Sequence, residues 1–120
     1  MSSSQDRTPL RLMVDGRDVA PLERATSTRA RSRGLLGRDG VEGAFWLDPC
    51  RHVHTVRMRF AIDVALVDRD HRVIDVRTMP PGRFGAVRRR CRSVIEAEAG
   101  SFERWGLVVG SSVGPAPAVD

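Results

Sequence analysis

Short alternations of apolar and polar residues along the chain predict β-strands joined by tight turns. Leu10–Val14 and Arg17–Ala20 flank Asp15-Gly16, and this dipeptide readily takes the positive φ of a two-residue hairpin turn. Ile62–Val67 and Arg72–Thr78 alternate in the same way on either side of a polar turn. We therefore expect two hairpins, of which the second has the clearer signal.

Shorter apolar segments complete the predicted strands. Ala44–Leu47 is the strongest apolar cluster of the chain and is expected in the core. Ser93–Ala97 and Leu107–Val113 are each expected to form a short strand. Pro21 interrupts the second strand of the first hairpin, so Leu22–Ala25 is predicted either as a bulged continuation or as a loop.

Two helical segments are predicted from residues that cap or end helices. Thr26 or Ser27 can cap a short helix over residues 28–36, and Gly37 would end it. A single helical turn is predicted at Phe102–Trp105, directly before a glycine. The proline- and glycine-containing segment from Met79 to Ala86 is expected to be a loop.

Strands joined by tight turns, without long helical crossovers, predict a mainly β fold. We expect an antiparallel sheet of about six to seven short strands, closed into a small barrel or sandwich, with one short helix and one helical turn. The chain of 120 residues fits a single domain, predicted over residues 9–113. The polar segments 1–8 and 114–120 are expected to be disordered tails.

The positive net charge of the chain is weaker evidence for nucleic-acid binding than its magnitude suggests. The formal charge is +5, and all 20 basic residues are arginine. Such a skew, beside many Ala, Val, Gly and Asp residues, is typical of GC-rich coding, so we discount it as evidence of an anionic partner. The run from Arg88 to Arg92 holds no aromatic residue for base stacking, so it is interpreted as a solvated loop and nucleic-acid binding is not expected.

Other features of the composition concern the cellular environment. No apolar run reaches the roughly 20 residues that a membrane helix needs, so no membrane insertion is expected. The start, M-S-S-S-Q-D-R-T-P, lacks the apolar region of a secretory signal, which predicts a soluble cytoplasmic protein. Cys50 and Cys91 are then expected to be reduced.

Four sequence blocks, G-L-L-G-R-D-G, H-T-V-R-M-R-F-A-I-D-V-A-L-V-D, V-I-E-A-E-A-G and W-G-L-V-V-G, closely resemble the family called domain of unknown function 192. They occur in the family's order between Leu22 and Val113. The resemblance implies a compact β-rich fold from bacteria and archaea, without an assigned biochemical role. The positions that match the family pattern are Gly34, Leu35, Arg38, His54, Met58, Asp63, Glu96 and Gly100.

The chain departs from the family pattern at two places. Val56-Arg57 stands where related sequences commonly carry Phe-Gly, and Ala61 stands where they usually carry Pro. Arg57 therefore argues against a sharp turn before Met58, because glycine is the residue that takes a positive φ most readily. It also adds a charge at the rim of any nearby pocket.

One candidate site is a metal site on the stretch that follows Pro49. Cys50, His52 and His54 alternate, so on an extended strand they would form a row on one face, with Asp63 within reach. Their sulfur, nitrogen and oxygen atoms are ligands that zinc accepts. Single Cys and His residues beside core aromatics are more often structural, so we expect no metal or other cofactor and keep this row as the weaker interpretation.

The leading candidate site is a polar pocket formed by His54, Thr55, Met58, Arg59, Asp63 and Glu96. It would bind a small polar or anionic molecule, and its imidazole and two carboxylates would shift one another's pKa values. The alternative is a structural network, because Asp63 and Glu96 lie in apolar strands and need partners on burial. An arginine such as Arg33, Arg38 or Arg59 could supply one. Both interpretations stay open.

These observations favour a binding or accessory module over an enzyme, without deciding the question. The chain has no G-x-S-x-G, no phosphate-binding glycine loop and no H-E-x-x-H. Cys50 and His54 would lie ~13 Å apart on a strand, too far for proton transfer. An enzyme that uses the same His, Asp and Glu residues on a small polar substrate is one alternative, and an interaction protein without a ligand is another. By loose family association, the partner could be a protein of a cell-envelope or secretion assembly.

Overall fold

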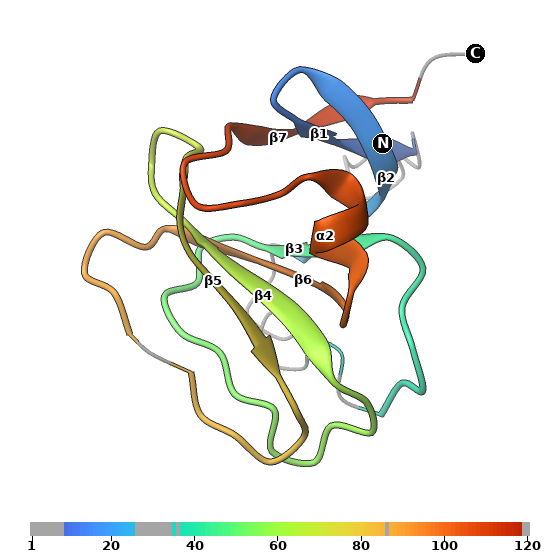
Figure 1. The fold of residues 1–120 in the computed structure, drawn as a ribbon, viewed down its shortest axis with the longest axis vertical. Helices are drawn as coiled ribbons and strands as arrows, with labels where there is room; N and C mark the ends of the chain where they lie inside the picture. The colour runs from blue at the N-terminus through green and yellow to red at the C-terminus, as the bar shows by residue number, and fades with distance from the viewer. Residues whose placement is uncertain (1–8, 26–34, 36, 86, 119–120) are drawn as a thin grey trace, which may run out of the picture.

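The computed structural model describes residues 9–25, 35, 37–85 and 87–118, and within them it contains seven strands and one short helix (Figure 1). In chain order these elements are β1 Leu10–Val14, β2 Arg17–Ala25, β3 Ala44–Leu47, β4 Ile62–Val67, β5 Val73–Met79, β6 Ser93–Glu98, α2 Ser101–Trp105 and β7 Val113–Pro117. None of the helices in these ranges is long and apolar enough to cross a membrane.

The strands form one mixed sheet in the order β5-β4-β6-β3-β2-β1-β7. Neighbouring strands pair antiparallel except β2 and β3, which run parallel. The outer strands β5 and β7 meet near their first residues through an isolated bridge between Arg72 and Ser112, and no further ladder joins them in the described part of the chain. The mainly β class is thus confirmed, whereas the sheet is not closed into a barrel.

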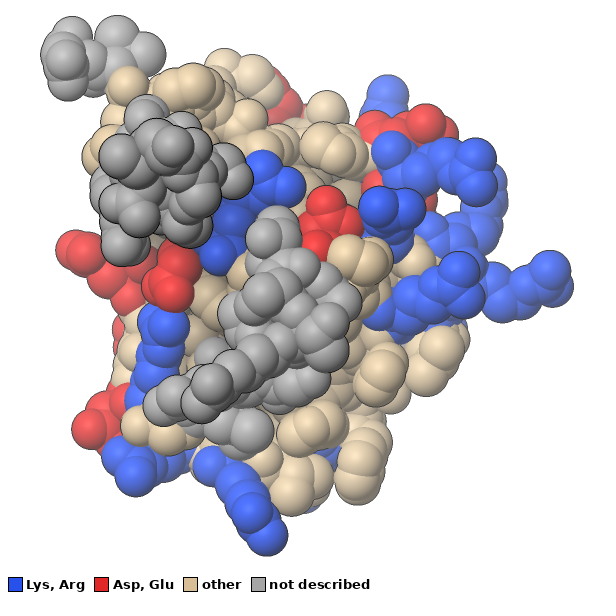
Figure 2. Space-filling model, turned by 180° about the vertical axis from the view of Figure 1, so that it is seen from behind, with Lys and Arg blue, Asp and Glu red and all other residues tan. Residues whose placement is uncertain are grey.

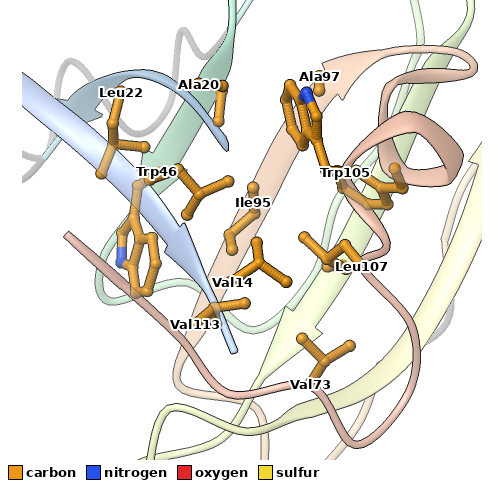
Figure 3. Close-up of a cluster of buried hydrophobic side chains, with 14 of the residues drawn as sticks. Val14, Ala20, Leu22, Trp46, Val73, Ile95, Ala97, Trp105, Leu107 and Val113 are labelled. Atoms are coloured by element: carbon orange, nitrogen blue, oxygen red, sulfur yellow. The ribbon is translucent and has the colours of Figure 1, made fainter. Parts of the chain in front are cut away.

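A first hydrophobic cluster fills the side of the sheet that α2 covers. Residues of β1, β3, β6 and β7 contribute to it, and α2 adds Phe102 and Trp105. Figure 3 shows side chains from these elements pointing toward one another around Ile95, with Val14, Leu107 and Val113 close to it. Trp46 is 1% exposed, so this cluster is the well-packed centre of the domain.

A second cluster covers the opposite side of the sheet. Successive side chains of β6 face opposite sides of the sheet, so Ile95 and Ala97 belong to the first cluster and Val94 belongs to the second. Phe45 and Leu47 of β3, and Ile62, Val64 and Leu66 of β4, also face the second side. The strands β3, β4 and β6 are therefore buried on both faces, which explains why apolar residues occupy both faces of each strand.

Both predicted hairpins are confirmed. β1 pairs with β2 around Asp15, whose φ is 51°, and β4 pairs with β5. Leu22–Ala25 continues β2 and supplies the parallel contact with β3. The predicted helical turn at Phe102–Trp105 is confirmed as α2. The helix predicted over residues 28–36 lies outside the described residues, apart from the buried Leu35.

The prediction for the C-terminal strand is wrong in its position. Leu107 to Ser112 form a connection held by the Leu107 and Ser111 amides, which donate to the carbonyls of Phe102 and Val108 at 2.9 and 3.0 Å. The strand is β7, which begins at Val113 and occupies residues 114–117 of the predicted disordered tail. It pairs with β1, and this outer position accepts two prolines because they need not donate to a second neighbour.

Candidate functional site

The stretch from Cys50 to His54 is not the strand that the alternation predicts. Only His54 is paired, through an isolated antiparallel bridge to Phe84, and its ring lies 6.1 Å from the Phe84 ring. His52 and His54 are exposed, whereas Val53 between them is buried. Among the described residues, no three His, Cys, Asp or Glu side chains lie close enough to hold a metal ion. The geometry therefore gives the predicted metal row no support.

Thr55 and Met58 have structural roles in the turn that follows. The Thr55 hydroxyl donates to the Pro80 carbonyl at 2.6 Å and accepts from the Arg83 amide at 2.8 Å. The Met58 amide donates to the Thr55 carbonyl at 3.0 Å, and its side chain is buried in the second cluster. The sharp turn is present even though Arg57 replaces the expected glycine, because Arg57 itself adopts a φ of 67°.

Asp63 is buried on the side of the sheet that holds the first cluster, where it anchors the helix. One carboxylate oxygen accepts from the amides of Gly100 and Phe102 at 2.9 and 3.0 Å, and the other accepts from the Thr78 hydroxyl at 2.7 Å. The carboxylate thus satisfies two amides at the start of α2 that have no partner within the helix. This arrangement agrees with the structural interpretation of Asp63, but its partners are two amides and a hydroxyl in place of the predicted arginine. Arg38 pairs with Glu23 and Arg59 with Asp39.

Glu96 faces the other side of the sheet. In the register it lies opposite Phe45 on β3 and Val64 on β4, both of which belong to the second cluster. Glu96 is 5% exposed. None of the described residues donates a hydrogen bond to its carboxyl group. Loss of hydration by burial raises the pKa of Glu96 to about 7.

The six residues of the predicted pocket therefore do not converge. Asp63 pairs with Ala97 in the register and Glu96 pairs with Val64, which places the two carboxylates on opposite faces of one sheet. His54 lies exposed on a loop, and the exposed Arg59 forms an ion pair with Asp39 at 3.0 Å. The premise that one pocket gathers an imidazole and two acids is wrong.

A different group of charged residues does converge, at one end of the sheet. A hollow of about 650 Å³, called here the charged hollow, is lined by Arg51, Asp68, Arg69, Asp70, Arg89, Arg90, Cys91 and Arg92. Five arginines face two aspartates there, an excess of three positive charges. Blue side chains gather at the right-hand edge of Figure 2, with red side chains among them.

The backbone of the loop from Arg88 to Arg92 is held firmly under these charges. The Arg92 amide donates to the Val67 carbonyl at 2.7 Å, and the Cys50 amide donates to the Arg92 carbonyl at 2.8 Å. The Cys91 thiol is buried and donates to the carbonyls of Cys50 and Ser93, each at 3.3 Å. Burial raises the pKa of Cys91, so this thiol stays protonated and serves as an anchor.

Most arginines of the charged hollow have no carboxylate partner. Arg92 pairs with Asp48 at 3.2 Å, but Arg51, Arg69, Arg89 and Arg90 form no ion pair with any residue that the structure describes. Asp68, which lines the same hollow, accepts the backbone amides of Asp70 and Arg72, each at 2.9 Å. The positive charge of the hollow is thus left available to an external anion.

A second hollow of about 820 Å³, called here the valine hollow, adjoins the first. Its lining residues are Val73, Ile74, Val87, Arg88, Arg89, Arg90, Val109 and Gly110. Arg89 and Arg90 line both hollows, so the two lie next to each other at these side chains. Val87 and Val109 are 66% and 60% exposed, so two aliphatic side chains from separate loops present apolar surface to this hollow.

The sequence contained one signal for this region, the run of arginines before Ser93. Its interpretation as a solvated loop missed that Arg51 and Arg69, distant in the chain, lie at the same hollow. A buried cysteine in the middle of a charged run was the available hint, because such a residue fixes the loop against the core.

The comparisons with known proteins concern the family and the fold. The model of the family domain of unknown function 192, described as an uncharacterized ACR, matches residues 11–114. Among curated proteins, none matches the chain.

Two solved structures share the fold. A protein of unknown function from Novosphingobium aromaticivorans is 20% identical with a TM-score of 0.72, and the match covers 88% of this chain and 83% of that one. A Sinorhizobium meliloti protein, provisionally described as a transcription regulator, is 19% identical with a TM-score of 0.74. Here the match covers 89% of this chain and 92% of that one. Since the family model spans most of its length, the chain belongs to the family domain of unknown function 192.

Proposed function

We propose that this protein is a binding module for a small phosphate-bearing anion, held in the charged hollow. The observation that carries the proposal is the convergence of Arg51, Arg69, Arg89 and Arg90 from three separate loops onto one hollow. Guanidinium groups bind phosphate through paired, charge-assisted hydrogen bonds, which makes arginine well suited to this ligand.

The surroundings of these arginines support a small ligand. Holding several like charges close together is unfavourable unless an anion or solvent compensates them, so a multivalent anion gains from every arginine at once. Among the described residues that line the two hollows, none is aromatic, so stacking of successive bases finds no platform there. The hollow also has the volume expected of a small-molecule site.

Titration of ¹⁵N-labelled protein with inorganic phosphate at low ionic strength tests the proposal. We expect amide shifts to change with saturation around the loop from Arg88 to Arg92. The double variant Arg89→Ala/Arg90→Ala should raise the Kd at least about tenfold, because charge-assisted hydrogen bonds contribute roughly 1.5 to 3 kcal/mol each. Added sodium chloride should weaken binding by screening.

The matched control is Arg57→Ala/Arg59→Ala, which removes two exposed arginines that line neither hollow. Its net charge equals that of the test variant, so it separates a specific site from general attraction to a basic protein. Equal weakening in both variants, or no saturable binding to the unmodified chain, would contradict the proposal.

A further inference from the structure

We infer that the ligand is a phosphate monoester with an apolar group, such as an aryl phosphate, whose apolar part occupies the valine hollow. This inference rests on the proposed function, because it places the phosphate in the charged hollow. It adds the chemical class of the group that the phosphate carries.

The valine hollow supplies the apolar contact. Val87 lies on the connection from β5 to β6 and Val109 on the connection from α2 to β7, yet both line the same hollow above the buried Val73. Two highly exposed valines on converging loops leave apolar surface in water, which an apolar ligand group would remove. In the described part of the chain, no side chain covers Val87 and Val109 enough to bury them.

The arginines fix the orientation of such a ligand. Arg89 and Arg90 line both hollows, so a phosphate bound to these two side chains would lie next to the valine hollow. Arg88 also lines the valine hollow, but its charge is paired with Asp75 at 3.1 Å. Arg72 donates to the Gly110 carbonyl at 3.2 Å. The arrangement places a charged part and an apolar part next to each other, which matches an amphipathic anion.

The size of the valine hollow favours a soluble molecule over a membrane surface. A volume of about 820 Å³ lies within the range of sites that hold a small organic molecule. The occupant that we assign is therefore a free aryl phosphate, and an anionic lipid headgroup is the competing source of the same chemistry.

Calorimetric titration with phenyl phosphate, inorganic phosphate and phenol tests the assignment. Phenyl phosphate should bind about tenfold more tightly than inorganic phosphate, the effect of removing roughly 60 Å² of apolar surface from water. Phenol should bind more weakly than either. In Val87→Ser/Val109→Ser this advantage should fall below about twofold, while the affinity for inorganic phosphate stays unchanged.

The control variant is Phe84→Ser, which removes an apolar side chain that is 81% exposed and lines neither hollow. It should keep the full preference for phenyl phosphate. Binding of inorganic phosphate without a preference for phenyl phosphate overturns this inference and leaves the proposed function standing. Absence of binding to both overturns both. Binding to phosphatidylglycerol vesicles, but not to phenyl phosphate, would assign the surface to a membrane and also overturn the inference.

Discussion

At the scale of single residues, Glu96 couples the stability of the fold to pH. Burial between apolar neighbours raises its pKa from an ordinary value of 4.5 to about 7. The folded protein therefore binds this proton more tightly than the unfolded chain does. The contribution of Glu96 to the free energy of unfolding should be largest below pH 4.5, fall as the pH rises to about 7, and change little above it. The total loss corresponds to about 3 kcal/mol.

Glu96→Gln should remove this dependence, because the amide has a similar shape and carries no ionisable proton. At pH 8 we expect the variant to be more stable than the unmodified protein by up to about 3 kcal/mol, and at pH 5 we expect a much smaller difference. Urea denaturation at pH 5, 6, 7 and 8 measures it. Glu98→Gln, two residues along β6 and exposed, is the control. An unchanged slope in Glu96→Gln would show that another group titrates.

Asp63 illustrates the opposite case, a buried carboxylate whose oxygens are all engaged. Asp63→Ala would leave the buried amide of Phe102 and the part-buried amide of Gly100 without an acceptor, at a cost of about 1 to 3 kcal/mol for the buried amide and less for the other. Asp63→Asn should lose less than half as much, because its carbonyl can accept both amides and its NH₂ can donate to Thr78. Urea denaturation of both variants and of Thr78→Ala compares these losses. If the free energy of unfolding of Asp63→Ala lay within about 1 kcal/mol of that of the unmodified protein, this role would be contradicted.

At the scale of elements, β7 matters more than its composition suggests. It covers the free edge of β1 and places Val113, which is 4% exposed, in the first cluster. A chain that ends at Ser112 should lose about 3 kcal/mol or fail to fold, since burial of valine alone contributes roughly 1.5 to 3 kcal/mol. A chain that ends at Ala118 keeps the whole strand and should match the full chain in thermal denaturation. Equal melting temperatures for the two truncations would show that β7 is dispensable.

At the scale of the whole molecule, the sheet order brings distant loops to one end. The connections after β3, β4, β5 and α2 all contribute residues to the two hollows. Figure 1 shows β1, β2 and β7 at one end of the molecule and β4 and β5 toward the other, so the central strands β3 and β6 link the two halves. A formal charge of +5 spread over the surface would attract anions weakly, whereas an excess of three positive charges at one hollow can select them.

The sequence by itself determined the elements that depend on neighbours in the chain. The two hairpins and the turn at α2 follow from local alternation, turn dipeptides and glycines, and each of these forces acts over a few residues. Local signals misled where tertiary contacts outweighed them. Arg57 takes a positive φ in place of a glycine, and β7 forms with two prolines because it pairs with β1.

Only the tertiary structure decided which charged groups meet. Asp63 and Glu96 lie on adjacent strands, and a register that pairs Asp63 with Ala97 sends their side chains to opposite faces. A shift by one residue would have brought them together, and the pattern of β4 and β6 could not fix it because both faces of these strands are apolar and buried. Three arginines that are distant in the sequence do meet, because the sheet order places their three loops at the same end. These residues are Arg51, Arg69 and Arg89.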